Sequence, residues 1–300
     1  CFVRDKGVTI TCGRNLYEAV VALTILEKSA EVNLKAEALG GAKPLPKIEA
    51  DFMRMIYKKK YSKAEQEVKS KEGDEMREKL VDYGKRLVAA GLVQGTWGNL
   101  SMRLSEETML VTPSGLDYNR LSPADMVKVD VRSLEHEGEH KPTSEKGLHA
   151  GIYQRRPEIG AVIHTHSKYA SVFAAAGRSV PVVQPELKRI FGSQVPLAKY
   201  GLPGTKTLKK HTIEALGDNN GCIMTAHGMI CCGRTMEEAF DHCLKLEDCC
   251  RQYIEEGYER DEQIMDIKEI LERQRSFFAE GVTKDLSYRR SALLKLRNEV

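Results

Sequence analysis

Three histidines have the residue type and spacing to bind a divalent metal ion. His164 and His166 lie two residues apart at the end of an apolar run, and the alternation of a β-strand directs both imidazoles to one face. His227 ends a second apolar run and precedes Gly228, where the backbone can approach a ligand closely. Three neutral imidazoles with an open position suit a catalytic zinc ion. The three histidines therefore predict a metal centre.

The other five histidines fit structural positions. A His-x-His pair also occurs on protein surfaces, so each further histidine needs a partner before it counts as a ligand. No such partner is visible at a recognisable spacing in the polar loop or in the predicted helices that carry His136, His140, His149, His211 and His242. We therefore assign these five no role in metal binding.

Composition excludes some classes of partner. The 300 residues are 41% hydrophobic and 30% charged, which is typical of one large or two modest globular domains. Because 46 basic and 43 acidic residues leave a formal charge of only +3, no overall field favours nucleic acid or a membrane surface. A small anionic substrate needs only a local basic or amide-lined pocket.

The eight cysteines favour a reducing compartment. Their adjacent pairs do not resemble the spaced framework of a small secreted domain, and six lie between Cys222 and Cys250, where we expect small buried apolar side chains. We find neither a signal peptide nor an apolar run of transmembrane length, which favours a cytoplasmic location. The start at Cys1, without an initiator Met, indicates a processed product or a segment of a longer protein.

Predicted helices and short strands alternate around the histidines. Asp74 can cap a helix from residue 75 to about residue 90, with Gly91 closing it. The pattern predicts strands over 100–104, 109–112 and 127–131, and helices over 148–154, 167–176 and 206–216. This mixture favours an α/β fold in which helices cover a largely antiparallel sheet.

An internal repeat links the beginning of the chain to its later part. Residues 10–19 align with 230–239 at a constant separation of 220 positions, and in both a short strand reaches Gly-Arg before a helix. Residues 1–43 therefore resemble the closing strand and helix of a preceding copy. Because Gly7 stands opposite His227, we expect this segment to be catalytically silent. Residues 44–73 are rich in Lys, Glu and Gln and fit a linker or an exposed helix.

Five motifs occur in the order and spacing of class II aldolases related to fuculose-phosphate aldolase, and residues 74–262 resemble this class II aldolase/adducin family. The resemblance implies a three-layer α/β/α fold with a largely antiparallel central sheet. The motifs are Gly95-Thr96-Trp97-Gly98-Asn99-Leu100-Ser101, Thr112-Pro113-Ser114-Gly115, Pro142-Thr143-Ser144-Glu145, His164-Thr165-His166-Ser167 and His227-Gly228.

The resemblance also implies the chemistry. Glu145 would be the catalytic acid/base beside a metal held by His164, His166 and His227, most simply Zn²⁺, with Mn²⁺ or Co²⁺ as alternatives. The reaction would be retro-aldol cleavage of a phosphorylated ketose through a metal-stabilised enediolate. The protein would be a homo-oligomer, a tetramer by resemblance. The phosphate would be bound by Asn99, Ser114, Gly115, Thr143 and Ser144.

Departures from the family pattern leave alternatives open. Pro185 stands where these aldolases place a tyrosine that donates a proton, and Tyr200, Tyr253 and Tyr258 could replace it only by residue type. A sister epimerase, dehydratase or decarboxylase could use the same metal site, although the epimerases usually have Asp at the position of Glu145. An adducin-like interaction module is the non-catalytic alternative, but such modules have generally lost the metal histidines. We expect Trp97 to pack beside the phosphate loop.

The last segment, 263–300, is helical and basic in pattern. Residues 267–300 resemble the opening helices of aldehyde dehydrogenases of the fatty-aldehyde type, but they carry neither a catalytic cysteine nor a cofactor loop. An amphipathic tail helix that docks on the domain or on a neighbouring subunit fits the same pattern. The sequence does not specify which sugar phosphate is bound or the physiological metal.

Overall fold

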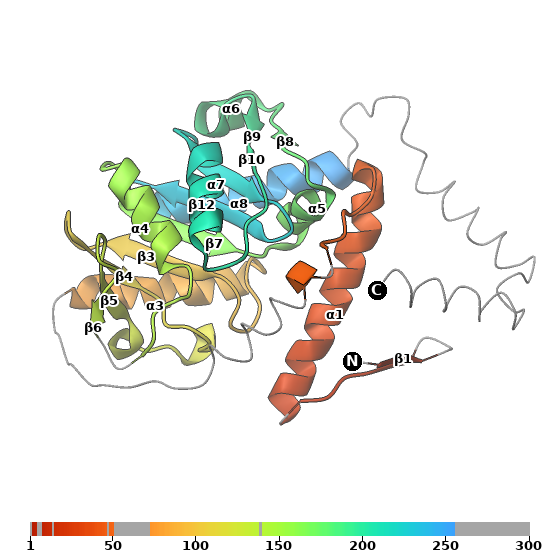
Figure 1. Cartoon of the computed structure of the whole chain (residues 1–300), viewed down its shortest axis with the longest axis horizontal. Coiled ribbons are helices and arrows are strands. Elements are labelled where there is room, and N and C mark those ends of the chain that lie inside the picture. Colours follow the sequence, from red (N-terminus) through yellow and green to blue (C-terminus); the bar gives the residue numbers. More distant parts are fainter. Residues whose placement is uncertain are drawn as a thin grey trace, which may run out of the picture.

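The fold is built on an eight-stranded central sheet (Figure 1). The computed structural model describes residues 2–4, 8–13, 15–46, 48–50, 73–137 and 140–255. The strand order is β10-β11-β12-β7-β3-β4-β5-β6, and every neighbouring pair is antiparallel except β10 and β11. The strands are β3 (Asn99–Arg103), β4 (Thr108–Val111), β5 (Val127–Asp130), β6 (His136–Glu137), β7 (Ala161–Thr165), β10 (Leu197–Ala198), β11 (Gly221–Met224) and β12 (Gly228–Gly233).

Helices cover both faces of this sheet. Side chains alternate along each strand, so that Ile163 of β7 belongs to the core on one face and Val162 to the core on the other. The first core is covered by α3 (Asp74–Ala89), α5 (Lys168–Ala176), α6 (Pro185–Phe191) and α8 (Met236–Glu255). The second is covered by α4 (Lys146–Arg155) and α7 (Lys206–Leu216). This arrangement confirms the predicted three-layer α/β/α fold.

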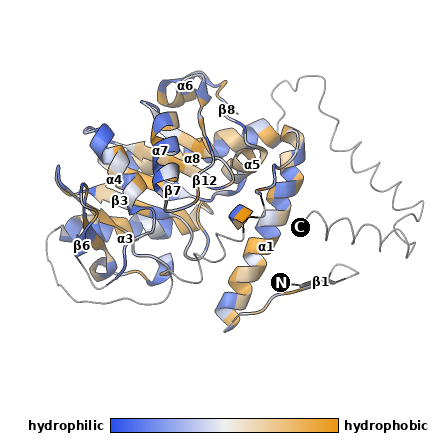
Figure 2. Cartoon of the chain, in the orientation of Figure 1, coloured by the Kyte–Doolittle hydropathy of each residue, from blue (hydrophilic) through white to orange (hydrophobic). Residues whose placement is uncertain are grey.

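Apolar burial follows the predicted elements closely. Figure 2 shows the central strands coloured largely as hydrophobic. The six cysteines between Cys222 and Cys250 are free and buried, as expected for small apolar side chains. The predicted cap of α3 was wrong: Gly73 occupies the N-cap without a side-chain bond, and Asp74 is the first helical residue, where its charge complements the helix dipole. Gly91 ends this helix with a φ of 70°, as expected.

Short elements complete the described chain. The 3₁₀ turns η2 (Tyr118–Arg120) and η3 (Pro123–Asp125) precede β5, and β8 (Val180–Pro181) pairs with β9 (Gln194–Val195). None of the helices in the described part of the chain has the length and apolar character to cross a membrane. Most of the predicted linker, residues 51–72, and the whole predicted tail, 263–300, lie outside the described residues.

An N-terminal hairpin and helix lie beside the sheet domain. Strands β1 (Phe2–Arg4) and β2 (Val8–Ile10) pair antiparallel, and α1 (Leu16–Ala36) follows, ending in the 3₁₀ turn η1 (Glu37–Leu39). Helix α1 packs along α5 and stands beside the domain, to the right of the sheet in Figure 1. This helix is therefore a separate layer outside the central α/β/α sandwich.

The repeat in the sequence is matched by local geometry. The pairs of β1–β2 and those of β11–β12 lie 220 positions apart, so that Phe2↔Ile10 corresponds to Cys222↔Ile230. The helices that follow have the same cap: a backbone N–H of the first turn donates to the side chain of Asn15 in α1 and to that of Thr235 in α8. The two segments thus share strand register and helix start.

Candidate metal centre and active site

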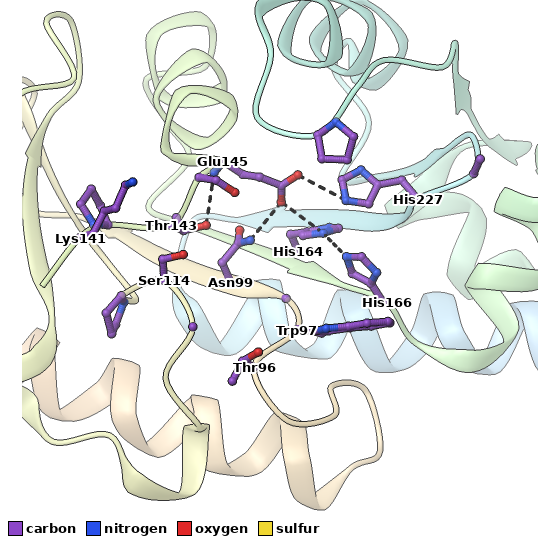
Figure 3. Close-up of a pocket in the computed structure, with 17 residues that line it drawn as sticks. Thr96, Trp97, Asn99, Ser114, Lys141, Thr143, Glu145, His164, His166 and His227 are labelled. Carbon is purple, nitrogen blue, oxygen red and sulfur yellow. Dashed lines mark hydrogen bonds and ion pairs between the residues drawn. The ribbon is translucent and has the colours of Figure 1, made fainter. Parts of the chain in front are cut away.

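The predicted site residues converge where the inner strands of the sheet end (Figure 3). His164 lies near the end of β7, and His166 follows that strand directly. His227 lies in the tight turn between β11 and β12, where Ala226 has a φ of 53°. Glu145 is the N-cap residue of α4, on the second face of the sheet. Segments far apart in the sequence therefore bring four titratable side chains together.

The three imidazoles form a group that could hold a metal ion. One nitrogen from each of His164, His166 and His227 lies within 4.8 Å of the others. Nδ1 of His164 donates to the carbonyl oxygen of Met229 over 2.8 Å, so its Nε2 carries the free lone pair. Burial lowers the pKa of His227 to about 4 and that of His166 well below its ordinary value. Both rings are therefore neutral near pH 7, the form that binds metal.

Two buried polar atoms beside the histidines also fit a cation. Nδ1 of His227 and Oε1 of Glu145 have no hydrogen-bond partner among the described residues. Orphaned buried polar atoms are costly unless another group satisfies them. A divalent ion near the three imidazoles would compensate the buried carboxylate by charge. The donor set therefore fits the metal that the sequence predicts.

Glu145 is fixed as a buried carboxylate. Its side chain is 5% exposed, and Oε2 accepts a hydrogen bond of 3.0 Å from Nδ2 of Asn99. Nε2 of His164 lies 3.2 Å from Oε2, and Nε2 of His227 lies 3.4 Å from Oε1. Burial raises the pKa of the carboxyl, but the two histidines and the Asn99 bond outweigh it and lower the pKa to about 2. Glu145 is therefore ionised near neutral pH.

A buried hydrogen-bond chain supports Asn99. Nδ2 of Asn99 donates to Glu145, so the other amide atom, Oδ1, accepts a hydrogen bond. Its donor is Nε2 of His149, which lies 2.5 Å from Oδ1. Burial lowers the pKa of His149 to about 3, so this ring is neutral and its Nδ1 accepts from Ser101 at 2.7 Å. The hydroxyl of Tyr153 lies 2.8 Å from Ser101. Every donor in this chain can therefore point toward the carboxylate.

No role for His149 was predicted from the sequence. A usable signal was present, because His149 lies four residues after Glu145 and residues with this spacing share a helix face. The backbone bond from His149 N to Glu145 O, 3.3 Å long, places them in successive turns. His149 thus has the position of a residue that orients the Asn99 amide.

We expect His149→Phe to lower kcat by about 10- to 100-fold without loss of metal, because the support of Asn99 is removed while the three imidazoles remain. Kinetics and metal analysis on the same samples would measure both effects. Tyr153→Phe is the matched control: it removes a hydroxyl at the far end of the chain and should leave kcat near that of the wild type. Equal losses in both variants would contradict a positioning role for His149.

A cavity of about 320 Å³ opens in front of Glu145 and the histidines. It is lined by all five residues that the resemblance assigns to phosphate, and Lys141, which was not predicted, also lines it. Two loops form this wall, joined by bonds from Ser114 N to Lys141 O and from Thr143 N to Thr112 O. The five predicted residues are Asn99, Ser114, Gly115, Thr143 and Ser144.

Glycines let two loops pack against the ligand-bearing end of β7. A Cβ at Gly98, which has a φ of 91°, would lie 2.7 Å from the carbonyl oxygen of His164. A Cβ at Gly228 would lie 2.4 Å from that of Thr165. The turn at Gly228 therefore approaches the backbone of Thr165, between the two histidines, and this contact helps to position the end of β7.

The aromatic residues considered from the sequence have clear positions. Trp97 packs beside His166, with ring centroids 5.4 Å apart, and lines the cavity. Pro185 begins α6 and does not line it, and Tyr253 packs against Phe173. The hydroxyl of Tyr200 is buried, and burial together with the nearby Glu49 carboxylate raises its pKa. Tyr258 lies outside the described residues.

Comparison with known proteins identifies the family. The model of the class II aldolase and adducin N-terminal domain matches residues 78–254. The chain belongs to this family. It is 35% identical over 178 residues to the 5-methylthioribulose-1-phosphate/5-deoxyribulose-1-phosphate aldolase of Rhodospirillum rubrum, a match that covers 59% of this chain and 80% of that protein. It is 30% identical over 183 residues to the L-fuculose phosphate aldolase of Escherichia coli, covering 61% and 84%.

Solved structures of the family have the same fold. An L-fuculose 1-phosphate aldolase superimposes with a TM-score of 0.59 at 29% identity, covering 68% of this chain and 96% of that one. Family members at this level of similarity include class II sugar-phosphate aldolases, which are lyases that use a divalent metal, and an L-ribulose-5-phosphate 4-epimerase of Salmonella paratyphi B that is 31% identical over 188 residues. The matched residues, 78–254, begin well after α1.

Proposed function

We propose that this chain is a metal-dependent aldolase that cleaves a ketose 1-phosphate into dihydroxyacetone phosphate and an aldehyde. One observation carries the proposal: three imidazoles and an ionised glutamate converge on one cavity whose far wall consists of hydroxyl- and glycine-bearing loops. The names of two relatives support the substrate class, since one is an aldolase of 5-methylthioribulose-1-phosphate and 5-deoxyribulose-1-phosphate and the other an aldolase of L-fuculose phosphate.

Binding of the phosphate is assigned to the loop wall. Hydroxyls and turn amides can bind a dianion, and Lys141 adds a positive charge on the same side. Ser114, Gly115, Thr143 and Ser144 would therefore hold the phosphate, with Asn99 between this group and the histidines. The carbonyl end of the substrate would then face His164, His166 and His227.

Catalysis needs one proton to move between Glu145 and carbon. A divalent cation bound to the three imidazoles would supply a Lewis acid that stabilises negative charge on the substrate oxygens. The hydroxyl proton of the aldehyde half passes to solvent while the electron pair of the carbon–carbon bond passes to the phosphate half. Glu145, ionised at rest, takes up a proton from solvent and delivers it to that carbon, and in the reverse direction it removes this proton. Asn99 keeps the carboxylate oriented for both steps.

Three nitrogen ligands favour Zn²⁺, with Mn²⁺ and Co²⁺ as the alternatives. The test uses the whole chain, stripped of metal by a chelator and reloaded with each ion in turn, with ketose 1-phosphates as substrates. We expect release of dihydroxyacetone phosphate and aldehyde to disappear with the metal and to return with it. Recovery of an epimerised, dehydrated or decarboxylated product instead would assign a sister reaction. Failure to bind any divalent ion would overturn the enzymatic proposal.

The remaining assignments follow the resemblance. We propose a cytoplasmic homo-oligomer, a tetramer by resemblance, whose size light scattering would measure.

We also propose a division into residues 1–43 as the end of another copy, 44–73 as a linker, 74–262 as the catalytic domain and 263–300 as a tail or the start of a further domain. The shared register of β1–β2 and β11–β12 supports the first of these. The resemblance of 267–300 to aldehyde dehydrogenases stays a prediction.

A further inference from the structure

A second cavity adjoins the metal centre. It has a volume of about 290 Å³. It shares a wall with the first cavity, the one of about 320 Å³ in front of Glu145, and this wall consists of Trp97, His166, Ala226 and His227. The phosphate loops do not line it. A substrate that places its phosphate in the first cavity and its carbonyl group at the histidines would therefore direct its other end into the second.

Helix α1 forms the outer wall of this second cavity. Lys28, Ser29, Val32 and Asn33 line it, and Nζ of Lys28 donates to the backbone carbonyl oxygen of His166. Val32 is only 8% exposed, so this face of α1 is packed against the domain. The helix lies outside residues 78–254, which match the family. The wall therefore comes from a segment outside the residues that match the family model.

Contacts at several points hold α1 in place. Glu31 lies 2.6 Å from Nζ of Lys168 on α5, and the hydroxyl of Tyr17 donates to Asp117 over 2.5 Å near the start of the helix. After the helix, the backbone N–H of Lys43 donates to the carbonyl oxygen of Ala175 over 2.8 Å. The helix is therefore fixed on both sides of Lys28, and the cavity wall is a defined surface.

We propose that α1 supplies the wall of the subsite for the aldehyde half of the substrate and thereby selects its length and polarity. This inference rests on the proposed aldolase reaction. Ala42, Ala174 and Ala175 make one side apolar, whereas Lys28 and Asn33 offer hydrogen-bond donors and the Ser29 hydroxyl, which donates to the carbonyl oxygen of Ile25, can accept. Among the residues that the structure describes, no acidic side chain lines the cavity. The subsite fits a short aldehyde of about two to four carbons that carries hydroxyl oxygens and no positive charge.

The test is to fill the cavity from α1 in the full chain. Ser29→Phe places a ring in the cavity, and Ala30→Phe, at the next exposed position, which does not line it, is the matched control. Aldol addition of dihydroxyacetone phosphate to aldehydes of two, three and four carbons is then measured. We expect Ser29→Phe to raise the KM for the longer aldehydes by about tenfold or more. The KM for dihydroxyacetone phosphate and the metal content should not change.

Trp97, the only tryptophan, gives a second readout that needs no turnover. It borders both cavities, so binding of unreactive alcohols that match the aldehydes should change its fluorescence in the wild type and in Ala30→Phe. Ser29→Phe should lose this response. Conversely, Val32→Ala should raise the relative rate with the four-carbon aldehyde.

The outcomes separate the two proposals. The role of α1 would be overturned if the wild type adds aldehydes but Ser29→Phe and Ala30→Phe have the same aldehyde KM and the same fluorescence response as the wild type. The aldolase proposal would then stay intact. A shift in the KM for dihydroxyacetone phosphate alone would also overturn it. A wild type that binds metal but neither cleaves nor adds would overturn the proposed function and, with it, this subsite.

Discussion

Replacement of His166 by alanine is expected to remove the metal and the activity together. The wild type should bind about one divalent ion per chain through three imidazoles, and two remaining nitrogens give a much weaker site. Because a metal ion stabilises developing charge by several kcal/mol, cleavage should fall by about a thousandfold or more. Metal content by mass spectrometry and product release, measured on the same preparation, test both expectations.

A control variant must show that the loss is specific to His166 and does not follow from removing any histidine. His136 is exposed on β6, far from the three imidazoles in the strand order, and His136→Ala should retain both metal and activity. Thermal unfolding of each variant without metal would show whether the fold is intact. An active His166→Ala protein with one ion per chain would remove His166 from the proposed ligand set.

Glu145→Gln is expected to separate metal binding from proton transfer. The substitution keeps the size of the side chain and an oxygen that can accept from Asn99, and it leaves all three imidazoles in place. It removes the group that exchanges a proton with carbon. General acid–base catalysis contributes about 10²- to 10⁴-fold, so kcat should fall by that factor while metal remains bound.

Hydrogen exchange isolates this step from carbon–carbon cleavage. In D₂O the wild type should exchange one carbon-bound hydrogen of dihydroxyacetone phosphate without any aldehyde, and nuclear magnetic resonance would follow the loss of signal. Glu145→Gln should lose this exchange, and Glu106→Gln, a change in an exposed loop, should keep it. Normal exchange in Glu145→Gln would assign the proton transfer to another group.

The sequence predicted the framework of the site because its determinants are local. Alternation along β7 directed His164 and His166 to one side, and their Nε2 atoms lie 2.9 Å apart. Helix α5 begins one residue after the predicted position and α7 begins at it, where the side chain of Thr205 caps the helix by accepting from the N–H of Leu208. The five-motif resemblance then identified Glu145, a residue that its own neighbours do not distinguish.

Long-range packing determined what the sequence did not predict. Lys141 reaches the cavity because two loops pair through Pro113 and Pro142, and this bridge has no signal in local composition. The position of α1 depends on contacts with partners more than 80 residues away, such as Asp117 and Lys168. A repeat pattern identified the shape of this segment but carried no information about where it docks.

Since α1 is attached from outside the sheet domain, substrate affinity is thermodynamically linked to helix docking. Only molecules with α1 in place present a complete aldehyde wall, so the apparent dissociation constant equals the intrinsic one divided by the docked fraction. Part of the attachment consists of half-exposed ion pairs such as Lys168 with Glu31, which salt screens. Ionic strength thereby becomes a variable that acts on one half of the substrate through a helix that carries none of the three histidines.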